Sequence, residues 1–339
     1  MIKTELLKAT NDNILSCSEM IKNGMIVAFP TETVYGLGAN GLNEKAVNDI
    51  FKAKGRPNDN PLILHVASIA DAEELYTDIP RKFYDLAEFF WPAPLTIICK
   101  KSKIVNNTVS AGLDTVAVRM PANKIALKLI EYSKCPIAAP SANLSGKPSP
   151  TTAYHVFHDM NGKIRAILDG GSCKFGVEST VISLIEEPII LRPGCVTPQM
   201  IEKVIGHVKI ADSIISPLKE GEKALSPGMK HTHYTPNATV IAFSGNPFEI
   251  ATKINNEYDN NKTKKCIILA SAENVDYYGN RNYEIIGKRT DSVSFCNSIF
   301  AEFRKYDDYD FIFCEAISPE NEGLAYMNRL LRACGFNIK

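Results

Sequence analysis

Two cations around a glycine are the residues in this sequence best suited to anion chemistry. Lys54-Gly55-Arg56-Pro57 follows a predicted helix, and a second proline, Pro61, stiffens the segment. Cations at the C-terminal end of a helix also offset its dipole, so the pair has a structural explanation as well. A rigid loop that presents Lys and Arg together can equally grip phosphate oxygens. We therefore take Lys54 and Arg56 as candidate phosphate ligands.

A second candidate loop, residues 139–151, follows a predicted strand and is rich in small hydroxyl, amide and proline residues. Small side chains let backbone N–H groups approach a nucleotide, although an ordinary turn-rich loop has the same composition. Arg119 lies inside an apolar run, Val116–Met120, and a buried cation needs a partner. Arg119 is therefore a candidate anion ligand. His65 stands alone on a predicted strand, where histidines are more often structural.

Two nucleotide motifs are incomplete in this chain. Gly36, Gly38 and Gly41 match G-x-G-x-x-G, but residues 31–35 lie between them and the preceding strand, and the residues downstream are basic. The dinucleotide motif needs glycines directly after a strand and an acid about twenty residues later, so a tight turn explains them better. Lys147 follows a glycine as in a P-loop, but Pro148 replaces the Ser or Thr that holds Mg²⁺. The sequence predicts neither an NAD site nor a P-loop.

Metal and nucleophilic chemistry also find little support. His155 and His158 are three residues apart on a predicted helix, without a third ligand nearby in sequence. We therefore predict no metal site. Cys173 lacks an evident base partner. The nine cysteines are scattered and form no C-x-x-C, which is typical of reduced thiols in a cytosolic protein.

Composition narrows the classes further. The chain has 339 residues, which favours two domains over one. It has 38 basic and 38 acidic residues, whereas a protein that binds nucleic acid through phosphates should show a basic excess. The N-terminus is polar and mixed in charge, and apolar runs stay shorter than a membrane span. We expect a cytoplasmic protein.

Hydrophobic periodicity predicts two α/β regions on either side of a Pro/Gly-rich segment. We expect domains at 1–206 and 237–339, joined by a linker or ordered loop at 207–236. The predicted N-terminal strands are 25–29, 62–66, 95–99, 115–120, 137–139, 166–168, 179–184 and 189–191, and the main helices are 43–54, 80–91, 123–133 and 197–205, with Ser68 capping another. The predicted C-terminal strands are 239–243, 266–270, 283–286 and 310–314, with helices at 247–258, 292–306 and 322–334. This C-terminal alternation predicts a small, mostly parallel sheet.

Four motifs in order resemble the YrdC-like family. They are Pro30-Thr31-Glu32-Thr33-Val34-Tyr35-Gly36-Leu37, Lys54-Gly55-Arg56-Pro57, Pro140-Ser141-Ala142-Asn143 and Ser179-Thr180-Val181. The chain length, the segment 226–236 and the C-terminal α/β domain are similar to the family's two-domain long form, the threonylcarbamoyl-AMP synthases. The resemblance covers essentially the whole chain. It rests on motifs in the first domain and on position and pattern in the second.

The resemblance implies a fold and a reaction. The fold is a twisted, mixed N-terminal sheet with helices and a basic cavity, followed by a smaller Rossmann-like α/β domain. The enzyme would be a nucleotidyltransferase that condenses L-threonine, bicarbonate or CO₂, and ATP into threonylcarbamoyl-AMP and pyrophosphate, with Mg²⁺ arriving on the triphosphate. The product would pass to a separate transferase that modifies the adenosine beside the tRNA anticodon. No protein nucleophile is required, in agreement with the residues.

The resemblance also assigns site residues. Lys54 and Arg56 would be catalytic, acting on phosphate charge. The ATP ligands would be Arg56, Asn60, Thr115, Ser141, Ser149, Arg192 and Tyr234. The threonine ligands would be Thr33, His65, Arg119, Ala139 through its backbone, and Ser179. Tyr234 would reach back from the linker, so we expect the segment around it to act as a lid.

Two other functions stay open at this point. One is a carbamoyl-adenylate-forming enzyme of the hydrogenase-maturation type, although the zinc-finger and acylphosphatase-like regions of that system have no counterpart here. The other is a tRNA- or double-stranded-RNA-binding module using the basic cavity, which the neutral charge disfavours. For the enzyme, direct tRNA contact is possible but is expected to be weak.

Overall fold

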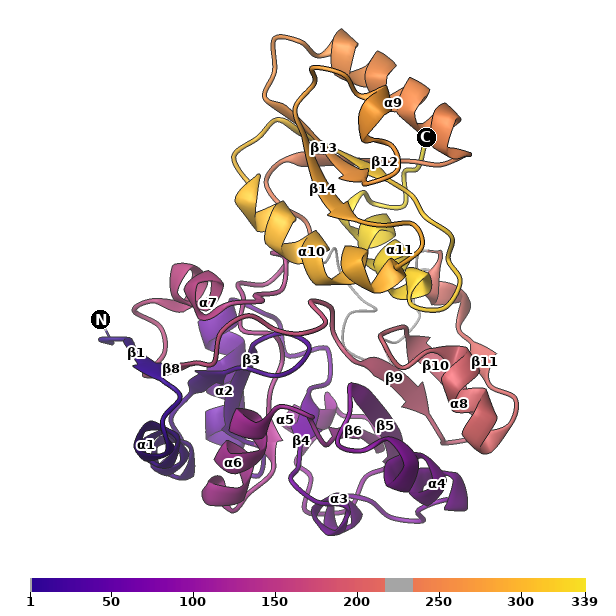
Figure 1. Cartoon of the computed structure of the whole chain (residues 1–339). Helices are drawn as coiled ribbons and strands as arrows, with labels where there is room; N and C mark the ends of the chain where they lie inside the picture. Colours follow the sequence, from indigo (N-terminus) through magenta and orange to yellow (C-terminus); the bar gives the residue numbers. More distant parts are fainter. Residues whose placement is uncertain (1, 217–233) are drawn as a thin grey trace.

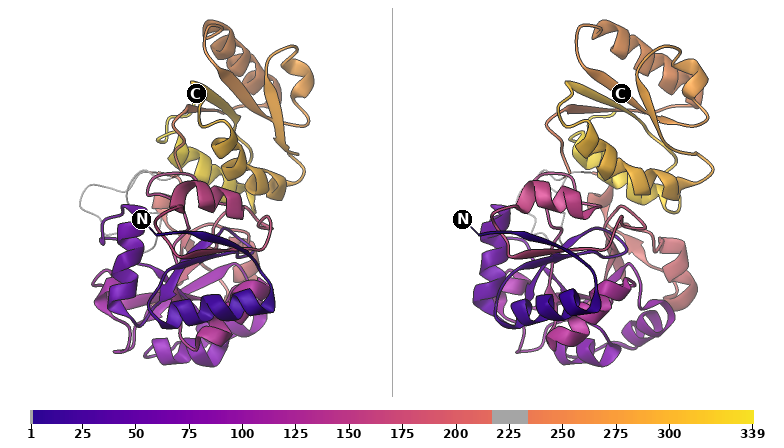
Figure 2. Two further views of the ribbon diagram at one scale, coloured as in Figure 1. Left: turned by 90° about the vertical axis from the view of Figure 1, so that its left-hand side faces the viewer. Right: turned by 60° about the vertical axis from the view of Figure 1, so that its left-hand side comes forward.

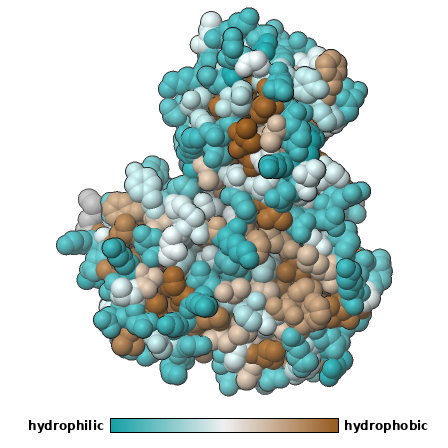
Figure 3. Space-filling view, viewed as in Figure 1, coloured by the Kyte–Doolittle hydropathy of each residue, from teal (hydrophilic) through white to brown (hydrophobic). Residues whose placement is uncertain are grey.

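The computed structural model describes residues 2–216 and 234–339. The chain forms a larger N-terminal and a smaller C-terminal α/β domain, which the views in Figures 1 and 2 show stacked on each other. The predicted linker falls largely on residues 217–233, outside the described part. Hydrophilic residues cover most of the face drawn in Figure 3, with smaller hydrophobic areas on both domains.

The N-terminal domain is built on a mixed sheet in the order β1-β8-β2-β3-β7-β4-β6-β5-β9-β10-β11. Parallel and antiparallel pairs alternate irregularly; for example, β4 pairs parallel with β6, and β6 pairs antiparallel with β5. The strands are β1 (Glu5–Lys8), β2 (Val27–Phe29), β3 (Gly36–Asn40), β4 (Ile63–His65), β5 (Leu95–Lys100), β6 (Thr115–Arg119), β7 (Ile137–Ala138), β8 (Ala166–Asp169), β9 (Thr180–Ser183), β10 (Ile189–Arg192) and β11 (Lys209–Ile210).

Most helices of this domain start at a side-chain cap. Asn43, Ser68, Asn123 and Thr197 each accept a backbone N–H of the first turn, which satisfies donors that have no partner inside the helix. The helices are α1 (Asn11–Lys22), α2 (Glu44–Lys54), α3 (Ile69–Leu75), α4 (Arg81–Phe90), α5 (Asn107–Ser110), α6 (Lys124–Ser133), α7 (Ala153–Met160) and α8 (Pro198–Ile205), followed by a short 3₁₀ turn, η1 (Asp212–Ile214).

The C-terminal domain has a fully parallel sheet in the order β12-β15-β13-β14. Its strands are β12 (Thr239–Phe243), β13 (Cys266–Ser271), β14 (Tyr283–Gly287) and β15 (Phe311–Glu315). Its helices are α9 (Pro247–Asn260), α10 (Ser292–Lys305) and α11 (Gly323–Ala333), with a 3₁₀ turn, η2 (Val275–Tyr277). Helices α10 and α11 lie between this sheet and the N-terminal domain, and α9 covers the far face (Figures 1 and 2).

The predicted strands and helices are confirmed to within two residues at each end, and Ser68 is confirmed as a cap. The turn predicted for Gly36 and Gly38 is wrong, because both lie in strand β3. A Cβ at Gly38 would approach the Phe29 ring to 2.7 Å and Ile137 to 2.9 Å. Close packing, rather than backbone freedom, therefore calls for glycine there.

One apolar cluster spans the boundary between the two domains. Val34 and Val177 of the first domain belong to the same buried cluster as Phe295, Phe300 and Tyr326 of the second. Because this surface is removed from water, it favours one fixed arrangement of the two domains. Within residues 2–216 and 234–339, no helix is both long and apolar enough to span a bilayer.

Candidate active site

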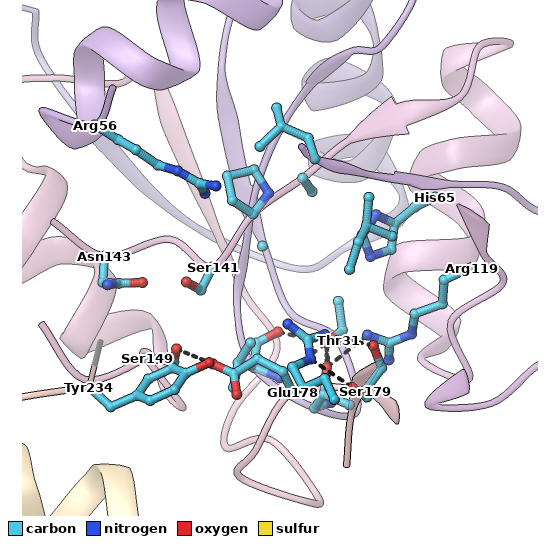
Figure 4. A pocket seen from close by; sticks show the side chains of 18 of the residues that line it. Thr31, Arg56, His65, Arg119, Ser141, Asn143, Ser149, Glu178, Ser179 and Tyr234 are labelled. Atoms are coloured by element: carbon cyan, nitrogen blue, oxygen red, sulfur yellow. Dashed lines mark hydrogen bonds between the residues drawn. The ribbon is translucent and has the colours of Figure 1, made fainter. Parts of the chain in front are cut away.

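One cavity gathers the motif residues of the N-terminal domain, as expected of a small-molecule site. Its walls come from the segment after β2, the ends of β4 and β6, the loop 139–149 and the segment around β9 and β10, with Tyr234 beside the second domain (Figure 4). Ten predicted site residues line it: Thr33, Arg56, His65, Arg119, Ala139, Ser141, Ser149, Ser179, Arg192 and Tyr234.

Arg119 sits at one end of the cavity, at the last residue of β6. It is almost fully buried, and its Nη2 lies 2.5 Å from Oε1 of Glu32. Its Nη1 donates to Oγ1 of Thr33 at 3.0 Å, and that hydroxyl lies 2.8 Å from Oγ1 of Thr31. Glu32 is the partner that a buried cation requires. The pair fixes the guanidinium at the wall of the cavity.

His65 is paired with Arg119 across β4 and β6. Burial, reinforced by the charge of Arg119, lowers the pKa of His65 from 6.5 to about 3. The imidazole is therefore neutral at pH 7 and can bind only by hydrogen bonds. Its Nδ1 is buried without a hydrogen-bond partner among the described residues.

Arg56 and Arg192 supply positive charge elsewhere in the cavity. Arg192 donates from Nε to the Ser179 carbonyl at 3.0 Å and from Nη2 to Ser179 Oγ at 3.1 Å. Arg56 donates from Nη2 to the Asn60 carbonyl at 3.1 Å. Burial lowers the pKa of each arginine to about 10, so both stay protonated at neutral pH. They give the cavity two cations at fixed positions.

Tyr234 closes the cavity from the side of the second domain. The residue is buried, its φ is +69°, and its ring lies 5.0 Å from that of Phe300. The guanidinium of Arg329 lies 5.6 Å from the ring centroid. The Tyr234 ring is thus held by α10 and α11 of the C-terminal domain while it lines the cavity.

Comparison with known proteins agrees with this geometry. A family model described as telomere recombination, for Sua5, YciO and YrdC, matches residues 19–194. A second model, described as the C-terminal domain of threonylcarbamoyl-AMP synthase, matches residues 196–335. This chain belongs to the Sua5/YciO/YrdC family. It has the two-domain form of that family.

Two relatives that match this chain over almost its full length carry the same name. The chain is 48% identical to a threonylcarbamoyl-AMP synthase of Pyrococcus abyssi, over 94% of this chain and 93% of that relative. It is 43% identical to the enzyme of the same name from Bacillus subtilis, over 99% and 96%. The crystal structure of P. abyssi Sua5 complexed with L-threonine superposes with a TM-score of 0.92 at 45% identity, covering 100% of this chain and 98% of that one.

Three predicted Sua5-family site residues lie outside the cavity lining. Nζ of Lys54, the last residue of α2, donates to the carbonyls of Ser141 and Asn143, and burial lowers its pKa well below the usual range. Asn60 is fully buried, and its side-chain amide has no hydrogen-bond partner within the described residues. Thr115 starts β6, whereas Arg119 ends it, and four residues of strand span about 13 Å. In this arrangement Lys54 supports the 141–143 loop from behind.

The structure adds a carboxylate that the sequence reasoning missed. Glu178 lines the cavity, and its Oε1 accepts Ser149 Oγ at 2.5 Å. Burial raises the pKa of Glu178, but Arg329 and Arg192 outweigh burial and hold it below the ordinary value. The sequence held a signal for Glu178, since it stands between Val177 and the Ser179-Thr180-Val181 motif, where burial is expected. A buried carboxylate needs a cation as its partner. The cation comes from α11, 151 residues away.

Metal ligands do not gather in the part of the chain that the structure describes. Within residues 2–216 and 234–339, no three His, Cys, Asp or Glu side chains lie together as an ion would require. His158 pairs its Nδ1 with Asp159 at 3.0 Å, and His155 approaches Thr151. Both histidines of the i, i+3 pair thus have local partners.

Proposed function

We propose that this chain is a threonylcarbamoyl-AMP synthase. It condenses L-threonine, bicarbonate and ATP into threonylcarbamoyl-AMP and pyrophosphate. The observation that carries the proposal is the full-length match to Sua5 complexed with L-threonine, together with a cavity in which Arg119 and Arg56 lie at opposite sides (Figure 4). A cavity with separate cations can hold an amino-acid carboxylate and a triphosphate at once.

The reaction needs no protein nucleophile. The threonine amine attacks CO₂, formed when bicarbonate takes up a proton and loses water, and gives a carbamate after releasing a proton. A carbamate oxygen then attacks the α-phosphorus of ATP, and the bond to the β-phosphate oxygen breaks, so that pyrophosphate leaves. Positioning and charge stabilisation are enough for such a displacement. The buried arginines of the cavity suit this task because their positions are fixed before the substrates arrive.

We assign the cavity residues by charge. Arg119 binds the threonine carboxylate, while neutral His65, Thr33 and Ser179 offer hydrogen bonds to its amine and hydroxyl. Arg56 and Arg192 face the phosphates, and Tyr234 covers the nucleotide. Ser141 and Ser149 complete the ATP side of the same lining.

Mg²⁺ reaches this site as part of the nucleotide in our proposal. The ion neutralises charge on the triphosphate. Glu178, the carboxylate of the described lining, is already paired with Arg329. We therefore propose that Mg²⁺ is bound by phosphate oxygens rather than by a protein carboxylate.

The product dictates what must follow. Threonylcarbamoyl-AMP is a mixed anhydride that hydrolyses readily, so we propose that a separate transferase takes the threonylcarbamoyl group to the adenosine beside the tRNA anticodon. The balanced charge of the chain favours weak tRNA contact, or none, for this protein itself.

Pyrophosphate release tests the proposal. The full chain should release pyrophosphate only when threonine, bicarbonate and ATP are all present, and threonylcarbamoyl-AMP should appear in equal amount by mass spectrometry. Release that continues without threonine contradicts the assignment. Tight, salt-dependent tRNA binding without turnover would favour an RNA-binding module instead.

A further inference from the structure

A buried arginine of the C-terminal domain reaches the wall of the cavity. Arg329 of α11 is 0% exposed, and its Nε donates to Glu178 Oε2 at 2.8 Å. Its Nη2 donates to the Glu178 carbonyl at 3.3 Å, and its Nη1 to the Pro193 carbonyl at 3.1 Å. One guanidinium therefore fixes both the side chain and the backbone of Glu178, as well as the residue after Arg192.

Glu178 poses an electrostatic problem for the proposed substrate. It places a carboxylate in the lining of a cavity that would receive a triphosphate. Its pKa is held low, so it is an anion at neutral pH. A buried anion repels phosphate at short range because the surroundings screen it poorly, and it attracts any cation within reach.

Arg192 is a cation close to Glu178, because it donates to the carbonyl and the hydroxyl of Ser179, the next residue along the chain. The charge of Glu178 contributes to the pKa of Arg192, and that of Arg192 to the pKa of Glu178. If Arg329 were neutral, Glu178 would turn to Arg192 as its remaining strong partner. Arg192 would then be an internal ion pair instead of a phosphate ligand, and Ser149 would lose the Oε1 acceptor that orients its hydroxyl.

We propose that Arg329 is a positioning residue for ATP: it neutralises and orients Glu178, so that Arg192 and Ser149 face the nucleotide. The proposal rests on the function proposed above and extends it across the domain boundary. It gives the C-terminal domain a defined part in the ATP side of the site. Arg119, which binds the threonine carboxylate in our proposal, has an ion pair of its own with Glu32, so we expect threonine binding to change less than ATP binding.

Steady-state kinetics of the full chain test this role. Arg329→Gln should raise KM for ATP about tenfold or more, which corresponds to about 1.4 kcal/mol of binding, and leave KM for threonine within about twofold. Arg329→Lys keeps the charge but loses the paired N–H donors of the guanidinium, so its KM for ATP should lie between those of Arg329→Gln and the wild type. Arg281→Gln is the matched control, because Arg281 pairs with Asp259 through two contacts of 3.1 Å and 2.7 Å elsewhere in the same domain.

The decisive measurement is the double variant. If the unpaired carboxylate causes the defect, adding Glu178→Gln to Arg329→Gln should lower KM for ATP back toward that of Glu178→Gln alone. A merely structural arginine would not be rescued in this way. The thermal unfolding midpoint of each variant shows whether it is folded. If Arg329→Gln does not fold, the KM values for ATP of Arg329→Lys and of the double variant test the proposal in its place.

Two results overturn the proposal: equal effects of Arg329→Gln on both KM values, or no rescue by Glu178→Gln. Failure of the proposed function looks different. In that case the wild-type chain itself releases no threonine-dependent pyrophosphate.

Discussion

At the scale of single residues, the cavity combines charged arginines with a neutral histidine. Arg119 and Arg192 are buried and Arg56 is partly buried in its lining, and an arginine stays protonated even when its pKa falls to about 10. His65 lies among them and has lost its charge to burial. A neutral imidazole avoids repulsion with Arg119 and still offers a hydrogen bond to a ligand.

The suppressed charge of His65 predicts a pH effect on stability. Its pKa is about 3 in the folded chain and about 6.5 when unfolded, so the unfolded state binds more protons between these values. Stability therefore falls as pH drops from 6.5 toward 3, by up to about 1.4 kcal/mol per pH unit. Urea unfolding at pH 6.5 and 5.0 should show that the free energy of unfolding falls less in His65→Gln than in the wild type.

The carboxylates are the same in both proteins, including Glu302, whose pKa burial raises. Glu178 and Asp159 have lowered pKa values, so the stability they contribute is lost only at lower pH. His155, with a pKa lowered to about 4, provides a second histidine that remains in the variant. Equal pH slopes for His65→Gln and the wild type would show that His65 is not neutral in the folded chain.

At the scale of elements, Lys54 joins helix α2 to the 141–147 loop. Its Nζ satisfies the Ser141 and Asn143 carbonyls, and its own carbonyl accepts the Ser145 N–H at 3.0 Å. The loop carries Ser141 into the cavity, so the end of a helix sets the position of a site residue. Lys54 can affect catalysis through this loop as well as through phosphate charge.

Hydrogen exchange separates these two roles of Lys54. Lys54→Met leaves two buried carbonyls without their donor, at a cost of about 1–3 kcal/mol each. We expect faster amide exchange across residues 141–147 and a KM for ATP raised about tenfold. Lys52→Met, at an exposed lysine paired with Asp49, is the control and should change neither. Slow exchange in Lys54→Met combined with lost activity would instead favour direct phosphate contact.

Local signals explain why most elements could be predicted from the sequence. The helical spacing of apolar residues and the N-cap side chains indicate helices such as α2 and α3, and short apolar runs indicate the central strands. β1 was missed because its edge position alternates exposed and half-buried residues, and it pairs with β8, about 160 residues away. β3 was missed because glycine is read as a turn former, whereas the neighbouring Phe29 ring demands it. Arg329 was missed for the same reason as β1: its partner, Glu178, is distant in sequence.

At the scale of the whole molecule, the C-terminal domain holds two walls of the cavity with two arginines. Arg329 binds the segment around Glu178 and Pro193. Arg304 of α10 donates to the Pro148 carbonyl at 3.1 Å and 2.6 Å, next to Ser149, and to both oxygens of Asp159 on α7. The apolar cluster that spans the domain boundary adds buried surface to these contacts. The domains should therefore unfold as one cooperative unit.

Arg304→Gln tests this coupling. The Arg304 side chain is 11% exposed and that of Asp159 is 4% exposed, so the substitution leaves a buried carboxylate without its arginine partner. Breaking such a pair costs about 3–5 kcal/mol. Calorimetry should show a lower midpoint and a broadened or split transition as the domains uncouple. Arg165→Gln, whose pair with Glu5 is 44% and 35% exposed, should cost less than about 1 kcal/mol. If Arg304→Gln keeps one sharp transition at the wild-type midpoint, the arginine does not couple the domains, and the apolar surface alone holds them together.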